Sequence, residues 1–282
     1  MSNYIESSGN LRGQGDISLF WHSWAVTNPR GIVVFVHGLG EHGGRYGNII
    51  NRLAGEGISF YTIDHRGHGK SQGKRGHLER FIYYIEDLKL VVDLAHRQNL
   101  GLPLVMLGHS MGGAIAGRYA LEHPDDIDGL ILSAAGLIPG TAPPGWQDKL
   151  LRLLSRLAPA TTFPNGLSAD DLSQDREVVK AYLDDPLVHD KISARWYTEI
   201  LDNTRQILKR AAELTMPLLV IHGSGDKIVS ITGSEQVFGA ARSVDKKYQA
   251  FPGLYHETMN EKQPEQSEVL DVVAEWILAH IT

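Results

Sequence analysis

The sequence contains no cysteine among its 282 residues. This absence excludes disulfide bonds, a thiol nucleophile, and metal or iron–sulfur sites built on thiolates. The chain also lacks an excess of basic residues, because its formal net charge is −6. An acidic chain without a basic cluster does not favour nucleic-acid binding, so we expect no nucleic-acid partner.

Long apolar runs are missing as well. No stretch of the sequence approaches the roughly 20 consecutive apolar residues that a membrane-spanning helix needs. The first six residues contain neither the basic nor the apolar segment of a secretory signal. We therefore expect a cytoplasmic protein. Hydrophobic residues make up 42% of the chain and charged residues 21%, which is typical of a globular domain with a sizeable core.

Strand and helix patterns alternate along most of the chain. Continuous apolar, often β-branched runs predict buried strands at residues 31–36, 58–63, 104–107, 129–133, 217–221 and 247–251. Helical patterns are expected at residues 46–55, 79–98, 233–241 and 264–281. A weaker alternation before residue 30 predicts one or two antiparallel edge strands. This order predicts an α/β fold with a mostly parallel central sheet and helices on both faces.

The alternation is interrupted between residues 137 and 213. Prolines recur there, and helical patterns are expected at residues 146–157, 170–183 and 194–212. We interpret residues 1–136 and 214–282 as the core, and residues 137–213 as an inserted helical cap that is mobile. Five leucines of the first cap helix make one side apolar, and we expect them to face the core, a pocket or a membrane surface: Leu150, Leu151, Leu153, Leu154 and Leu157.

A Gly-x-Ser-x-Gly pattern follows the strand at residues 104–107. Ser110 lies between Gly108 and Gly112, and small residues follow it at helical spacing. This pattern between a strand and a helix holds a serine in a sharp, strained turn with its hydroxyl exposed. Free N–H groups at the start of the helix favour developing negative charge. The sequence therefore predicts that Ser110 is a nucleophile.

A serine nucleophile needs a base and an acid that orients the base. Loops after two later strands carry Asp226 and His256, so the chain order is Ser, Asp, His. Because parallel strands gather their carboxyl ends at one edge of a sheet, we expect the three side chains to meet there. Glu257 and Asp202 are alternative acids.

The same geometry predicts an oxyanion hole formed by two backbone N–H groups. One belongs to Met111, the residue after the nucleophile, and the other to the loop that follows the strand at residues 31–36. Glycines at 38 and 40 let this loop bend, which favours the N–H of Leu39. The Leu39 side chain is then free to line a pocket for an acyl group.

The remaining histidines are expected to have structural roles. His37, His109 and His222 each stand beside a glycine or the elbow serine, and we expect them to brace loops. A second group, His42, His65, His68 and His77, lacks the spacing of known zinc motifs. We expect no metal and no cofactor.

Several motifs together resemble a known family. They are His37-Gly-Leu-Gly-Glu-His42 with Arg45 and Tyr46, Asp64-His-Arg-Gly-His-Gly-Lys-Ser71, Gly73-Lys-Arg-Gly-His77, Gly108-His-Ser-Met-Gly-Gly113, His222-Gly-Ser-Gly-Asp226, and Tyr255-His-Glu257 with Asn260 and Glu261. The sequence resembles the monoacylglycerol lipase and lysophospholipase branch of the α/β-hydrolases. The resemblance implies a triad of Ser110, Asp226 and His256, oxyanion donors at Leu39 and Met111, and a cap over the acyl pocket.

We therefore expect a serine ester hydrolase that cleaves monoacylglycerols or similar single-chain lipid esters through an acyl-enzyme. Leu39, Leu150 and Leu154 are the expected substrate-binding residues, and the cap is expected to touch membrane surfaces transiently. The alternatives are a lysophospholipase, a general carboxylesterase or thioesterase, and a non-catalytic scaffold of the same fold. The sequence does not specify an oligomeric state.

Overall fold

The structure is a computed structural model that describes residues 4–141 and 144–281. The first three residues and the last residue of the expected core, and residues 142–143 of the expected cap, lie outside the described residues. Among the described residues, no helix is both long and apolar enough to cross a membrane.

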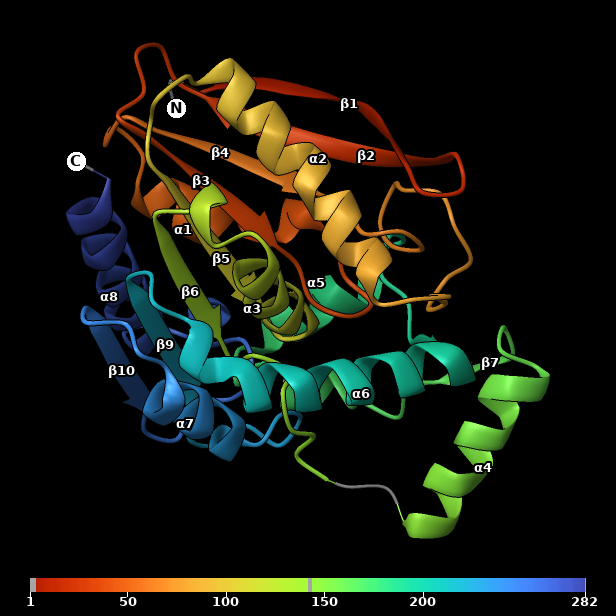
Figure 1. Ribbon diagram of the computed structural model, residues 1–282. Coiled ribbons are helices and arrows are strands. Elements are labelled where there is room, and N and C mark those ends of the chain that lie inside the picture. The colour runs from red at the N-terminus through yellow and green to blue at the C-terminus, as the bar shows by residue number, and fades with distance from the viewer. Residues whose placement is uncertain (1–3, 142–143, 282) are drawn as a thin grey trace.

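A central sheet organises the part of the chain that the structure describes (Figure 1). Its eight described strands, in chain order, are β1 (Ile5–Gly13), β2 (Ile17–Ala25), β3 (Gly31–Val36), β4 (Ile58–Ile63), β5 (Leu104–His109), β6 (Gly129–Ser133), β9 (Leu218–Gly223) and β10 (Lys246–Phe251). Their spatial order is β1-β2-β4-β3-β5-β6-β9-β10. Strands β1 and β2 run antiparallel to their neighbours, and the other six are parallel. The predicted mostly parallel α/β sheet is confirmed.

The strands of the sheet centre are buried on both faces. Every residue of β3, β4, β5, β6 and β9 is buried, as continuous apolar runs predict. Successive residues point to opposite faces: Val33 and Phe35 pack into one core cluster, and Ile32, Val34 and Val36 pack into the other.

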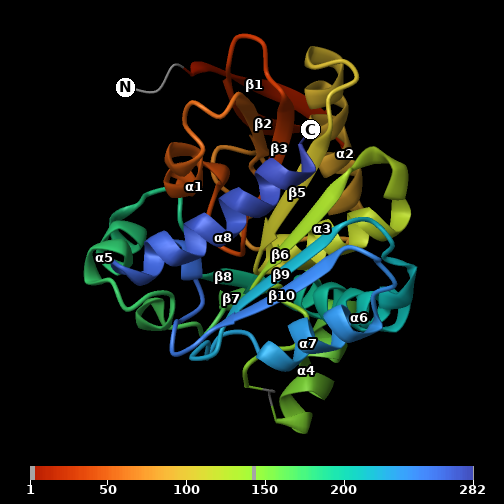
Figure 2. The same ribbon diagram turned by 90° about the vertical axis from the view of Figure 1, so that its left-hand side faces the viewer.

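Helices cover both faces of the sheet (Figure 2). On one face lie α1 (Gly47–Arg52) and α8 (Glu265–His280), whose apolar residues join the cluster of Val33. On the other face lie α2 (Ile82–Gln98), α3 (Met111–Glu122) and α7 (Ile231–Ala240), which join the cluster of Val34. The carboxyl ends of the six parallel strands lie at one edge of this layered core.

The chain between β6 and β9 lies over these strand ends. It contains α4 (Gly145–Leu157), β7 (Thr162–Pro164), α5 (Arg176–Asp184), β8 (Lys191–Ser193) and α6 (Ala194–Arg210). The expectation of helices alone was incomplete, because β7 and β8 form an antiparallel pair. Each of these strands has only three residues, too few for a period-two pattern. Tertiary contacts hold β8 instead, since the N–H of Ser193 donates to the carbonyl of Gly76 at 2.7 Å.

Helix α5 begins later than the expected start at residue 170. The Asp175 side chain accepts the N–H of Glu177 at 2.9 Å and caps the helix at Arg176. Residues 169–171 form a separate short 3₁₀ turn.

Helix α4 stands apart from the sheet, with α6 between them (Figure 1). Its polar side faces α6, where Ser155 and Thr198 share a hydrogen bond of 2.8 Å. Its apolar side is largely exposed: Trp146 is 65% exposed, Leu150 46%, Leu153 52% and Leu157 75%. These four side chains therefore do not pack the cap onto the core.

Candidate active site

Ser110 lies between the last residue of β5 and the first residue of α3, at the edge where the parallel strands end. Its backbone has φ 54° and ψ −122°, a region that a non-glycine residue adopts at a cost of about 1–3 kcal/mol. The end of β6 and the residues after it hold this conformation. The N–H of Ser110 donates to the carbonyl of Ser133 at 3.0 Å, and the N–H of Gly136 donates to the carbonyl of Ser110 at 2.7 Å. The strained turn predicted from the motif is present.

Two glycines allow close approach around this turn. A Cβ on Gly112 would lie 2.0 Å from the carbonyl oxygen of Val36, so only glycine fits against β3. A Cβ on Gly38 would lie 3.3 Å from the Cβ of Ser110. The loop after β3 therefore passes directly beside Ser110. Leu39 of this loop and Met111, the residue after the serine, line the same cavity as Ser110.

His256 contacts Asp226 across the loops that follow β10 and β9. The distance from His256 Nδ1 to Asp226 Oδ2 is 2.7 Å, and both side chains are almost fully buried. The other carboxylate oxygen of Asp226 accepts the N–H groups of Ile228 at 2.8 Å and Val229 at 3.0 Å. Asp226 is therefore fixed in a position to orient the imidazole of His256.

The surroundings of Asp226 keep its carboxyl group ionised. Burial alone would raise its pKa, but hydrogen bonds from His222, His256 and the backbone N–H of Val229 lower this pKa well below its ordinary value. The contribution of His222 Nε2, which lies 3.1 Å from Asp226 Oδ2, was not predicted from the sequence. The signal available was the short spacing between His222, near the end of β9, and Asp226, in the loop that follows.

The two alternative acids have other partners in the structure. Glu257 accepts hydrogen bonds from Arg45, and Asp202 on α6 pairs with Arg152 and Arg205. Asp226 is thus the carboxylate, of the three considered, that contacts His256.

His37 and His109 pack beside the candidate catalytic residues. His37 bonds to the carbonyl of Gly38 at 2.8 Å, and its Nε2 accepts the N–H of His65 at 2.9 Å. The ring of His109 lies against that of His256, with centroids 4.8 Å apart. Burial, together with the nearby His256, lowers the pKa of His109 to about 4, so His109 is neutral at neutral pH.

The second histidine group is not one site. His42 pairs with Asp185 at 2.9 Å, and His77 bonds to Ser193 at 2.8 Å. His65 and His68 are buried beside His37. Within the described residues, no group of three or more histidine, aspartate or glutamate side chains is arranged to hold a metal ion.

Two cavities meet at Ser110. The larger has a volume of about 1010 Å³ and lies under α4 and α6. Its apolar lining includes Leu39, Met111, Leu137, Ile138, Trp146, Leu150, Leu151, Phe163, Ile192, Trp196, Ile200, Leu201 and Val229. The smaller has a volume of about 470 Å³ and reaches His256. Its polar and charged lining includes Glu41, Arg45, His109, Asn165, Ser168, Tyr182, Asp185, His189, Asp190 and Glu257.

The three expected substrate-binding leucines lie differently. Leu39 lines both cavities, and Leu150 lines the larger one. Leu154, one turn further along α4, is not among the residues that line either cavity. The helical spacing put Leu150 and Leu154 on one side of α4, but only the first of them reaches over the cavity.

Comparison with known proteins also indicates a hydrolase. Residues 27–263 match the hydrolase family described as serine aminopeptidase, S33. The chain is 38% identical over 286 residues to the monoacylglycerol lipase of Mycolicibacterium smegmatis, covering 100% of both chains. It belongs to the monoacylglycerol lipase branch of the α/β-hydrolases. As a member of this branch it is a serine hydrolase.

Solved structures of this branch have the same fold. The crystal structure of the Paleococcus ferrophilus monoacylglycerol lipase matches with a TM-score of 0.85 and 35% identity, covering 93% of this chain and 99% of the other. A soluble variant of the Saccharomyces cerevisiae monoglyceride lipase, in complex with a substrate analog, matches with a TM-score of 0.87 and 25% identity, covering 97% and 95%.

Proposed function

We propose that this serine hydrolase cleaves monoacylglycerols to fatty acid and glycerol. The observation that carries the proposal is the pair of cavities at Ser110: the larger is mainly apolar, and the smaller has polar and charged side chains among its lining. An ester placed at the junction would put a single acyl chain in the apolar cavity and a small hydroxylated alcohol in the polar one. A single-chain lipid ester with a glycerol headgroup has this division of polarity.

The proposed catalytic residues are Ser110, His256 and Asp226. Ser110 Oγ attacks the ester carbonyl while His256 accepts its proton, and Asp226 orients and stabilises the resulting imidazolium. The backbone N–H groups of Leu39 and Met111 donate to the oxyanion of the tetrahedral intermediate. His256 then protonates the departing alcohol, and a water molecule hydrolyses the acyl-enzyme by the same steps in reverse order. The Asp226–His256 contact of 2.7 Å supports this assignment.

Residues 137–213 are proposed to act as the cap that selects the substrate. Leu39 and Leu150 are the proposed contacts of the acyl chain, since both line the apolar cavity. A covered cavity favours one acyl chain over the two or three chains of bulkier acylglycerols.

We also propose that α4 brings the protein to lipid surfaces. Its exposed apolar side carries Trp146, Leu150, Leu153 and Leu157, and the first two of these also line the apolar cavity. Lys149, Arg152 and Arg156 make the same helix basic. A basic amphipathic helix of this kind lies at the interface of a membrane with its apolar side in the acyl region. Substrate could then pass from the lipid surface to Ser110 without crossing water.

A hydrolysis panel tests the proposal. Purified protein is assayed on monoacylglycerols of graded chain length, diacylglycerols, triolein, lysophosphatidylcholine, p-nitrophenyl esters and acyl thioesters. We expect the highest kcat/KM on monoacylglycerols, with values that rise with chain length and then level off. Each buried CH₂ group contributes up to about 0.8 kcal/mol until the cavity is filled.

The alternative functions predict different results in the same panel. Preference for lysophosphatidylcholine or for thioesters would replace the proposed substrate class and leave the catalytic residues unchanged. Cleavage of triolein as fast as monoolein would contradict the covered cavity. A protein without hydrolysis, and without labelling of Ser110 by a fluorophosphonate probe, would be a non-catalytic scaffold.

A further inference from the structure

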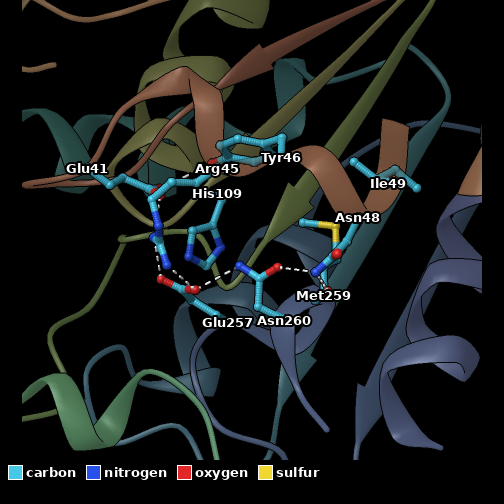
Figure 3. Close-up of a pocket in the computed structure, with 9 residues that line it drawn as sticks. All are labelled: Glu41, Arg45, Tyr46, Asn48, Ile49, His109, Glu257, Met259 and Asn260. Atoms are coloured by element: carbon cyan, nitrogen blue, oxygen red, sulfur yellow. Dashed lines mark hydrogen bonds and ion pairs between the residues drawn. The ribbon is translucent and has the colours of Figure 1, made fainter. Parts of the chain in front are cut away.

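Arg45 stands at the centre of a buried ion network beside the proposed catalytic residues (Figure 3). Its Nη1 donates to Glu41 Oε2 at 2.6 Å and to Glu257 Oε1 at 2.7 Å, and its Nη2 donates to Glu257 Oε2 at 2.9 Å. The side chains are 12% exposed for Arg45, 5% for Glu41 and 4% for Glu257. The proposed mechanism assigns no step to these three residues.

The two carboxylates belong to different loops of the proposed site. Glu41 Oε1 accepts the N–H of Gly38 at 2.6 Å, and Gly38 immediately precedes the proposed oxyanion donor Leu39. Glu257 immediately follows His256. Arg45 therefore connects the loop that carries one oxyanion donor to the loop that carries the base, although these loops are more than 200 residues apart in sequence.

The network has little freedom to rearrange. A guanidinium binds a carboxylate through two parallel N–H bonds in a fixed plane, as Arg45 binds Glu257. Glu257 Oε2 also accepts Asn260 Nδ2 at 2.8 Å, and Asn260 Oδ1 accepts Asn48 Nδ2 at 2.8 Å (Figure 3). The cavity enclosed between these side chains has a volume of only about 20 Å³.

Charge keeps the network together at neutral pH. Burial would raise the pKa of both carboxyl groups, but the Arg45 guanidinium lowers the pKa of Glu41 and of Glu257 below their ordinary values. Both therefore stay ionised and remain acceptors for Arg45. A neutral amide in place of Glu257 would turn its N–H₂ group toward the guanidinium. One in place of Glu41 would turn it toward the guanidinium or the N–H of Gly38, so either variant loses one contact of the bridge.

We infer that Arg45 is a positioning residue that holds the oxyanion loop, residues 37–40, in register with the loop of His256. The inference rests on the proposed function, because it requires Leu39 and His256 in the roles given above. A displacement of about 1 Å between reacting groups costs up to about 10²-fold in rate, while substrate binding is little changed. Breaking the bridge should therefore lower kcat and leave KM nearly constant.

Arg45 also lines the polar cavity, so a second role for it is contact with the leaving alcohol. The two roles separate on substrates without glycerol. A positioning residue affects the ester carbonyl whatever the alcohol, whereas a residue that binds glycerol matters only when glycerol is present.

The experiment uses Glu257→Gln, Glu41→Gln and the double variant, assayed on monobutyrin and on p-nitrophenyl butyrate. Active protein is counted by titration with a fluorophosphonate, so that unfolded molecules do not enter kcat. We expect each single variant to lower kcat about tenfold on both substrates, with KM within about twofold. The double variant should lose much less than the product of the single losses, since either change already breaks the bridge.

Asp87→Asn is the matched control. Asp87 accepts two hydrogen bonds from Arg66, at 2.6 and 2.7 Å, and is fully buried, but neither residue lines the cavities at Ser110. This variant should lower Tm while kcat stays within about twofold, as expected for a purely structural ion pair.

Three results would overturn the inference. A loss confined to monobutyrin and visible in KM would make Arg45 a glycerol contact. Lower Tm with unchanged kcat in both single variants would make the network purely structural. Losses that multiply in the double variant would show that the two loops are not linked through Arg45. A wild-type protein that hydrolyses p-nitrophenyl butyrate but neither monobutyrin nor longer monoacylglycerols would refute the proposed substrate, and the p-nitrophenyl assay would still test the inference.

Discussion

The loops at the strand ends and helix α4 are held in opposite ways. Asp226 and His256 are almost fully buried, and Asp226 accepts hydrogen bonds from two backbone N–H groups. Helix α4 packs mainly on α6, and much of its apolar side faces solvent. A catalytic group must stay within a fraction of an ångström of its partners, whereas a cap must admit and release substrate. The difference supports the proposal that the loops carry the chemistry and that α4 contributes to substrate selection.

Residues 182–189 of the cap are held by specific contacts with the core, as the strand-end loops are, whereas α4 packs mainly on α6. Asp185 pairs with His42 at 2.9 Å, the N–H of His189 donates to the carbonyl of Gly40 at 2.9 Å, and the Tyr182 ring lies 4.9 Å from the Arg45 guanidinium. These contacts tie residues 182–189 to residues 40–45, which follow β3. Movement of the expected mobile cap should therefore be concentrated in α4 rather than shared by all of residues 137–213.

The largest expected effect is that of Ser110→Ala, which tests the loop side of the comparison. Loss of the nucleophile should lower kcat by more than about 10³-fold, by the same factor on short-chain and long-chain esters. Rates on monobutyrin and monoolein measure it, with Tm as the control for folding. A variant that keeps more than a tenth of the wild-type kcat would remove Ser110 from the mechanism.

A smaller effect is expected from pH on the wild-type protein. In the proposed mechanism His256 must be neutral to accept the proton of Ser110. The pKa of Asp226 is held well below its ordinary value, and that of His109 is lowered to about 4. One ionisation should therefore govern the acid side, and kcat/KM should fall about tenfold per pH unit there. The slope should be equal for short and long chains. A flat profile between about pH 5 and 8 would argue against a histidine base.

The smallest expected effect is selective, and it tests the α4 side. Leu150→Asp places a charge in the lining of the apolar cavity. Because Leu150 is 46% exposed, we expect about half of the 1.5–3 kcal/mol of a fully buried leucine, which lowers kcat/KM on long-chain esters roughly fourfold to tenfold. Short-chain esters should change less than about twofold. Leu153→Asp is the control, because Leu153 is exposed and does not line the cavity.

Leu153→Asp should leave soluble esters unchanged and slow only the hydrolysis of monoolein presented in anionic vesicles. Equal losses on short-chain and long-chain esters in Leu150→Asp would contradict a role of α4 in substrate selection.

Much of this protein could be predicted from its sequence because the evidence is local. Apolar runs such as residues 31–36 specify buried strands, and the Gly-x-Ser-x-Gly pattern specifies a strained turn, since each depends on neighbours a few residues away. The contact between Asp226 and His256 was also predictable from the sequence, because the strand ends of a parallel sheet meet at one edge.

The tertiary structure decided what depends on distant pairs. The three-residue strands β7 and β8 have no pattern of their own and form only against each other and Gly76. Leu150 and Leu154 share one side of α4 in sequence, but the position of the helix over the cavity separates them. Glu41, Arg45 and Glu257 were visible as motif residues, yet their ion network exists only because the fold brings the loops after β3 and β10 together. Buried charges must find partners in space, and spacing along the chain does not reveal which partners those are.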